Sequence, residues 1–252
     1  MTTSLLNSLL RALLRWGAAL VFCLPLRHRS HFWVRACGML FPLLLLAQLL
    51  DPLAQSTTLW QQQLLLLVLY VSFFALLGGM IYLCTDINKK GAMYCAVWSL
   101  LIAQCAYEGW CFLELQFVRY GHPLNMASPW AVLVQLLSGA VFFAAVYLLL
   151  ARQLPYKGEY HIGPRQLFSA FFIGILFMVQ AAVLDNFRAE QFPRSVIATI
   201  LIGQFYFITL LYFQSELFKK SAMEKEMNAL NLLYERQRQQ YQVARPNVQI
   251  IN

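Results

Sequence analysis

Two acidic residues stand out because they lie inside or beside a long apolar run, where a charge is costly. Glu108 sits in the stretch Ala-Tyr-Glu-Gly-Trp, and Glu114 follows six residues later. That spacing puts them on different faces of a helix, so they do not form a paired acid–base site. An ionisable group within a membrane segment is a functional hypothesis by default. Glu108 could bind a cationic ligand group or pair with Arg119, or it could make a structural hydrogen bond.

A second charged group follows the sixth apolar run. Asp185, Arg188, Glu190 and Arg194 crowd the short stretch DNFRAEQFPR. Such a loop could recognise a ligand, although loops of this kind are usually just solvated. The candidate ligand-binding set is therefore Glu108, Glu114, Arg119, Asp185 and Arg188.

Other ionisable residues favour structural interpretations. Arg11 and Arg15 lie four apart on one helical face of the first apolar run. A charge at the bilayer centre costs about 2.5–3.5 kcal/mol, but near the end of a helix these side chains could reach the interface. The run would therefore either span the membrane or lie on it. His28 and His31 have the spacing to share a metal, but no local acidic or cysteine partner supports one. We therefore expect no metal.

The chain carries no recognisable catalytic motif. It lacks a phosphate-cradling glycine loop, a nucleophile elbow and an HExxH sequence. Its six cysteines show no CxxC spacing and mostly fall inside apolar runs, as packing residues do. We therefore expect no catalytic residues and no cofactor in this chain.

The elements that position these residues are long and apolar. With 60% hydrophobic and 12% charged residues, the composition is that of an all-α, polytopic membrane bundle. Asp51 and Pro52 are expected to end the second run. The predicted spans number seven, or six if the first lies on the membrane: 4–26, 36–50, 59–84, 92–113, 130–151, 167–184 and 195–218.

Charge in alternate loops predicts the orientation. One set of loops, together with the segment after the last span, holds ten Lys or Arg residues, and the other set holds three. The positive-inside rule places the richer set and the C-terminal segment in the cytoplasm. The net charge of +8 thus fits a membrane protein in contact with lipid, and we expect no nucleic-acid partner. We predict residues 1–218 as a transmembrane sensor domain and 219–252 as a cytoplasmic linker helix.

The C-terminal segment has the spacing of a coiled coil. Apolar or uncharged residues recur alternately every four and three positions, and charged and amide residues fill the gaps. A polar helix with such a seam needs a partner, most simply a second copy of itself. The predicted dimer seam is Met223, Met227, Leu230, Tyr234, Gln237, Tyr241, Ala244, Val248 and Ile251.

The end of this segment resembles a known signalling family. The sequence RQQYQVARPNVQIIN, through Tyr241, Asn247, Ile250 and Asn252, is similar to the linker helix of GHKL-type (Agr-like) bacterial sensor histidine kinases. Pro246 departs from the pattern, and proline predicts a kink near 242–246. The resemblance implies a bacterial plasma-membrane protein whose phospho-acceptor histidine lies beyond Asn252.

The resemblance also implies the partners. ATP and Mg²⁺ would belong to a kinase domain outside this chain, a response regulator would receive the signal, and a secreted peptide could be the stimulus. A small-molecule ligand and a change in the bilayer are the other signals that we consider. We therefore predict a sensing module that signals through its last span to the linker helix. The alternatives are a small transporter or channel, an integral-membrane enzyme, or a membrane scaffold.

Overall fold

The computed structural model describes residues 2–55, 59–119, 129–153, 162–187 and 194–249. The described residues form helices, and none of them belongs to a β-strand of a sheet. They divide into two compact units, Met1–Tyr212, here called the bundle, and Phe213–Asn252, here called the tail. The predicted all-α architecture is confirmed for the described residues.

Nine helical elements follow one another along the described chain. They are α1 (Thr2–Cys23), α2 (Phe32–Gly38), α3 (Leu40–Gln55), α4 (Leu59–Cys84), α5 (Lys89–Arg119), α6 (Pro129–Val146), the π-helix η1 (Tyr147–Ala151), α7 (Pro164–Phe187) and α8 (Arg194–Gln249).

Four helical segments in the described part of the chain are long and apolar enough to cross a membrane. They are Phe32–Leu49, Leu67–Cys84, Lys89–Glu114 and Trp130–Ala151. Several helices of this length and composition indicate a membrane protein. The seven-span topology stays a prediction.

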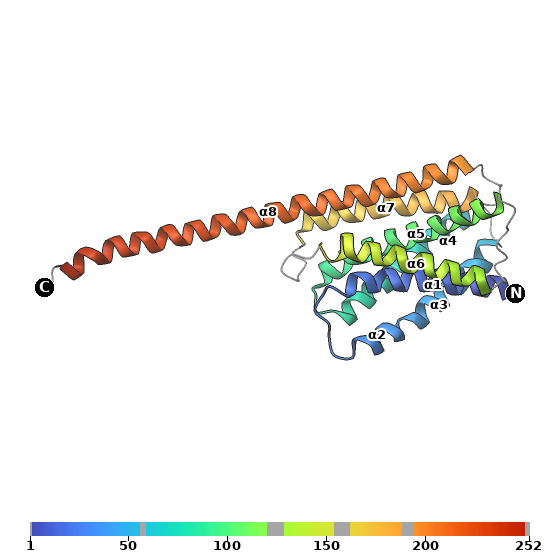
Figure 1. The fold of residues 1–252 in the computed structure, drawn as a ribbon, viewed down its shortest axis with the longest axis horizontal. Coiled ribbons are helices and arrows are strands. Elements are labelled where there is room, and N and C mark those ends of the chain that lie inside the picture. Colours follow the sequence, from blue (N-terminus) through green and yellow to red (C-terminus); the bar gives the residue numbers. More distant parts are fainter. Residues whose placement is uncertain (1, 56–58, 120–128, 154–161, 188–193, 250–252) are drawn as a thin grey trace. The chain divides into compact units, whose positions relative to one another are not determined.

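Helices α1 and α5 form the centre of the bundle (Figure 1). α1 packs against α3, α4, α5 and α6, and α5 also packs against α4, α6 and α7. Alanines on α1 let neighbouring helices approach closely, since Ala12, Ala18 and Ala19 are fully buried. On α5, Trp98 is fully buried and its ring lies 6.1 Å from that of Phe22 on α1. The two central helices are thus held by small residues at some levels and large aromatic residues at others.

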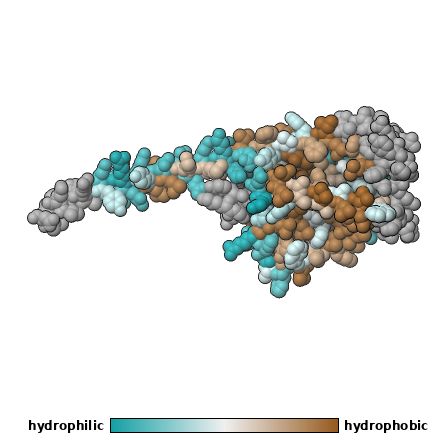
Figure 2. Space-filling view, viewed as in Figure 1, coloured by the Kyte–Doolittle hydropathy of each residue, from teal (hydrophilic) through white to brown (hydrophobic). Residues whose placement is uncertain are grey.

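The outer surface of the bundle is strongly apolar. Figure 2 shows hydrophobic residues over much of its visible flank. On α6 and η1, large apolar side chains such as Leu137, Val141 and Leu149 are exposed. Lipid chains would solvate such a surface, whereas water would not.

The predicted end of the second apolar run is wrong. We expected Asp51 and Pro52 to stop it, but α3 continues through both residues to Gln55. The same run is also interrupted earlier, since α2 ends at Gly38 and α3 begins at Leu40. A proline in a membrane helix is tolerated where surrounding groups satisfy the freed carbonyl, so its presence does not by itself end the helix.

Candidate functional site

The N-terminal helix turns its two arginines towards the interior of the bundle. The guanidinium carbon of Arg15 lies 3.9 Å from the centre of the Phe73 ring on α4, and Arg15 is only 8% exposed. Arg11 donates from Nη2 to the hydroxyl oxygen of Tyr107 on α5 over 2.6 Å. Arg15 is therefore enclosed by the bundle, with its guanidinium group against Phe73. Packing against aromatic rings gives the guanidinium groups an attractive surface inside the bundle.

Glu108 lies on the neighbouring part of α5 and is almost completely buried, with 1% of its surface exposed. Its Oε1 accepts a hydrogen bond of 2.9 Å from Nε2 of Gln104, one turn earlier. The structural hydrogen bond that we considered for Glu108 is thus present. We refer to Arg11, Arg15, Gln104, Tyr107 and Glu108 as the polar cluster.

A small cavity lies between α1 and α5, beside the polar cluster. Its volume is about 20 Å³, and Arg11, Arg15, Gln104 and Tyr107 contribute to its lining. A space of this size holds about one water molecule. The cluster therefore lacks room for a separate organic ligand in this conformation, and its two guanidinium groups oppose a cationic one.

The polar cluster links α1 to α5. Buried polar contacts between packed helices can fix which residues face each other. Any sliding of α1 along α5 would break the hydrogen bond from Arg11 to Tyr107.

The other predicted ligand residues are not brought together by the described contacts. Glu114 is half-buried on α5 and is absent from the described residues that line the small cavity. Asp185 lies in α7 and Arg119 at the end of α5, but their side chains lie outside the described residues, as does Arg188. The proposed roles of these four residues stay predictions.

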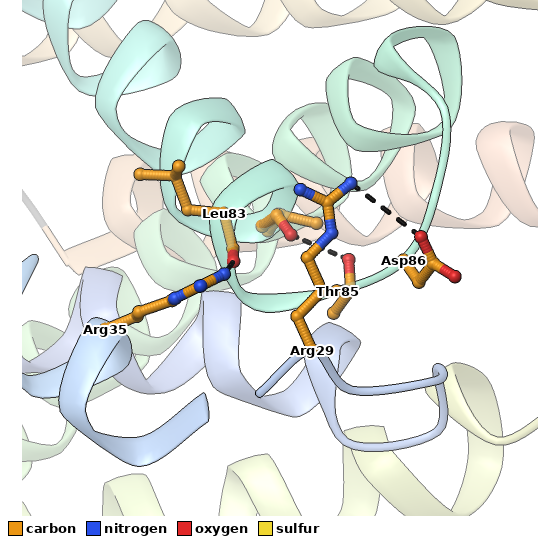
Figure 3. A network of polar contacts seen from close by, with 6 residues as sticks. Arg29, Arg35, Leu83, Thr85 and Asp86 are labelled. Atoms are coloured by element: carbon orange, nitrogen blue, oxygen red, sulfur yellow. Dashed lines mark hydrogen bonds and ion pairs between the residues drawn. The ribbon is translucent and has the colours of Figure 1, made fainter. Parts of the chain in front are cut away.

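One end of the bundle holds a basic polar network (Figure 3). The segment after α1 pairs with the segment after α4: the amide of Arg29 donates to the Cys84 carbonyl over 3.0 Å, and that of Asp86 donates to the Arg27 carbonyl over 2.8 Å. Figure 3 shows the side chain of Arg29 beside the Asp86 carboxylate, 3.8 Å away. Nη1 of Arg35 donates to the Leu83 carbonyl over 2.9 Å, which satisfies a carbonyl at the end of α4. We call this region the basic end.

The basic end also presents aromatic side chains. Trp33 and Val34 on α2 are exposed, and the buried ring of Phe32 lies between Trp33 and His28. His28 donates from Nε2 to the Cys23 carbonyl, which ties it to the end of α1. No group of three metal-binding side chains occurs in the described part of the chain. Basic and aromatic residues together are typical of a membrane interface.

The first part of helix α8, up to Tyr212, belongs to the bundle. Leu211 is fully buried, and the ring of Phe207 lies 6.3 Å from that of Phe177 on α7. A Cβ atom added at Gly203 would lie 3.0 Å from Nε2 of Gln180, so this glycine accommodates the α7 side chain. α8 therefore meets α7 at the levels of Gly203 and Phe207.

The tail of α8 exposes apolar residues. Met227, Leu230, Tyr234 and Tyr241 are all exposed, and Leu230 shows 59% of its surface. They lie on one side of the helix, together with Met223 and Gln237, and these six residues are called the tail stripe. Ala244, Val248 and Ile251, which continue the predicted seam, lie outside the described side chains. α8 runs past Pro246 to Gln249, and the predicted kink stays a prediction.

Sequence reasoning missed Gln104 and Tyr107 as members of the polar cluster. Two signals were available, because Arg11 and Arg15 on one helix and Gln104 and Glu108 on another both have a spacing of four. Each pair therefore forms a polar patch on one helical face. Nothing in the sequence showed that these two patches meet.

Comparisons with known proteins do not assign the chain to a family. The sequence matches no protein-family model and no curated protein, and the fold matches no solved structure.

Proposed function

We propose that this chain is the sensing and transmitting region of a dimeric membrane receptor. The bundle would detect a ligand or a change in the bilayer, and α8 would carry the response to the tail. The observation that carries the proposal is the continuity of α8, whose 56 residues include both buried bundle positions and the exposed tail stripe. A single helix is stiff enough to pass on a rotation, tilt or shift.

A second copy of the chain is the partner that best fits the tail stripe. From Met223 to Tyr241 the stripe covers about 27 Å at 1.5 Å per residue. Its spacing is that of a two-stranded coiled coil, in which two such stripes bury each other. Leu232 is as exposed as Leu230, at 59% each, but it lies roughly 200° further around the helix. It therefore provides a matched control on the opposite side.

The basic end supports the proposed orientation. Its basic residues come from three places: Arg27 and Arg29 follow α1, Arg35 lies in α2, and Lys89 and Lys90 begin α5. Basic residues concentrate on the cytoplasmic side of membrane proteins. In the proposed topology, seven spans cross a bacterial plasma membrane and the tail is cytoplasmic.

The output of the proposed receptor follows from the resemblance of the tail. A GHKL-type histidine kinase would be activated by the rearranged tail and would phosphorylate a response regulator. The signal would shift a population between two arrangements of the bundle that differ in the contacts of the polar cluster. A secreted peptide and a small molecule are both compatible with this scheme.

The proposal is tested by substituting a residue in the bundle and measuring disulfide formation in the tail. Leu230→Cys is introduced into a chain that also carries Cys37→Ser and Cys111→Ser, since Cys37 is exposed and Cys111 is half-buried. The rate of disulfide formation between copies is then compared in lipid nanodiscs with and without Gly203→Leu. Because a side chain at Gly203 would displace Gln180, we expect the rate to change by about fivefold, a typical size for coupling between sites.

The matched control is Gly79→Leu on α4. A Cβ atom added at Gly79 meets nothing within 4 Å, so this substitution leaves the packing of α8 unchanged. An equal rate in all three proteins would contradict transmission through α8. Absence of any disulfide at Leu230 would contradict the dimer itself.

A further inference from the structure

A large apolar cavity, open to the outside of the bundle, is lined by α5, α6 and α8. Its volume is about 720 Å³, within the range of ligand pockets. Gly109 and Trp110 line it from α5, Leu137 and Val141 from α6, and Leu201 and Phe205 from α8. All of these residues belong to the unit Met1–Tyr212.

The lining determines the chemistry of an occupant. None of the described lining residues is charged, and the lining includes the Ser138 hydroxyl, which already donates to the Gln135 carbonyl over 2.9 Å. An ion would lose its hydration here without compensation. A flexible hydrocarbon chain would instead gain contacts along the whole length of the cavity.

The shape of the cavity also fits an elongated occupant. Its lining extends along α5 from Cys105 to Leu113 and along α6 from Val134 to Ala145. At 1.5 Å per residue these stretches are about 12 Å and about 16 Å long. Because the exposed face of α6 is apolar, the occupant would enter from the bilayer.

The cavity touches the helix to which we assign transmission. Leu201 and Phe205 precede Phe207 and Leu211, which pack inside the bundle, on the same helix α8. An occupant that fills the space beside Leu201 and Phe205 would therefore favour one position of α8 over another. Its effect would depend on its different affinity for the two positions.

We propose that this cavity binds the aliphatic chain of a lipid-like signal molecule and that binding repositions α8. The second half of this proposal rests on the proposed function, whereas the binding itself does not. The polar head of the ligand would lie outside the apolar lining. The site would therefore recognise the hydrocarbon chain and not the head.

Photolabelling tests the binding. The full chain in nanodiscs is irradiated with a diazirine-bearing palmitic acid, and labelled peptides are identified by mass spectrometry. We expect saturable labelling of the lining segments of α5, α6 and α8, with excess unlabelled palmitic acid lowering it by about tenfold. Labelling that rises in proportion to the probe and resists competition would show contact with bulk lipid alone and would overturn the proposal.

Two filling variants and one control locate the site. A Cβ atom at Gly109 meets nothing within 4 Å, so Gly109→Leu can extend into the cavity without a clash. Ala145→Phe fills it from the exposed face of α6. We expect each to lower saturable labelling by about tenfold and Gly79→Leu to leave it unchanged. Undiminished labelling in both folded filling variants would overturn the site.

The tail provides a separate readout. In the Leu230→Cys protein, saturating palmitic acid should change the rate of disulfide formation by about fivefold, and Gly109→Leu should abolish the change. Saturable labelling with an unchanged rate would overturn the repositioning of α8 and leave the binding site in place. Failure of Leu230→Cys to crosslink at all would count against the dimer, whereas loss of saturable labelling would count against the cavity.

Discussion

The bundle buries a charge, whereas the tail exposes a hydrophobic side chain. Arg15 on α1 is 8% exposed, whereas Leu230 on α8 is 59% exposed. Lipid explains the first placement, because the bundle surface must be apolar and its polar groups must find partners inside. The exposure of Leu230 is unfavourable in water, because a row of apolar residues on a polar helix normally packs against another surface. The buried charge thus has its contacts within the bundle, whereas the exposed row of the tail is where we propose that a second copy binds.

The largest effect is expected at the tail stripe. Leu230→Asn should weaken the dimer by about 3 kcal/mol, since two leucines lose their burial and each contributes about 1.5 kcal/mol or more. Dimer dissociation in nanodiscs or mild detergent, followed by single-molecule counting, measures the change. Leu232→Asn is the control and should leave the dimer intact. Equal weakening by both substitutions would show that the stripe is not the interface.

The second effect concerns the buried charge. Arg15→Ala should lower the thermal stability of the bundle by about 2 kcal/mol, the size of a desolvated cation–π interaction. Thermal unfolding in detergent gives the measurement, with Arg152→Ala at an exposed position as the control. If Arg15→Ala unfolds at the same temperature as the unchanged protein, the contact between Arg15 and Phe73 does not stabilise the bundle.

A smaller effect is expected where α1 meets α6. A Cβ atom at Gly17 would lie 2.9 Å from Cε2 of Phe143, so the ring would have to move. Gly17→Leu should therefore destabilise the bundle by about 1 kcal/mol through overpacking. The same unfolding assay applies, and Gly79→Leu, which meets open space, should be neutral. If Gly17→Leu and Gly79→Leu unfold at the same temperature, the close approach of α1 and α6 at Gly17 does not contribute to stability.

The smallest effect is expected at the basic end. Asp86→Asn removes the 3.8 Å ion pair with Arg29, but both side chains are partly exposed. Pairs of this kind contribute about 0.5 kcal/mol, so the unfolding temperature should hardly change. A large loss would show that the network in Figure 3 holds the bundle together more strongly than its exposure indicates.

The sequence predicted the helices better than their contacts. The run Leu59–Cys84 coincides with α4, because length and hydrophobicity alone define such a segment. The end of α3 was misplaced, because a proline that usually ends a helix in water can be retained within a membrane helix. The tail stripe was visible in the sequence because its period is local.

The polar cluster and the apolar cavity could not be predicted in the same way. Arg15 meets Phe73, and Arg11 meets Tyr107, across separations that no local period records. The cavity arises where α5, α6 and α8 leave space between them, and Gly109 gives only a weak sign of it. Both features depend on how the helices pack, which hydrophobicity leaves open.

A cysteine scan of the tail shows whether two copies meet along the tail stripe. Single cysteines are placed at Met227, Leu230 and Tyr234 on the stripe and at Leu232 and Arg236 on the opposite side, and disulfide yields between copies are compared in nanodiscs. We predict high yields at the three stripe positions and low yields at the other two. Equal yields around the helix, or a monomeric chain, would contradict this prediction.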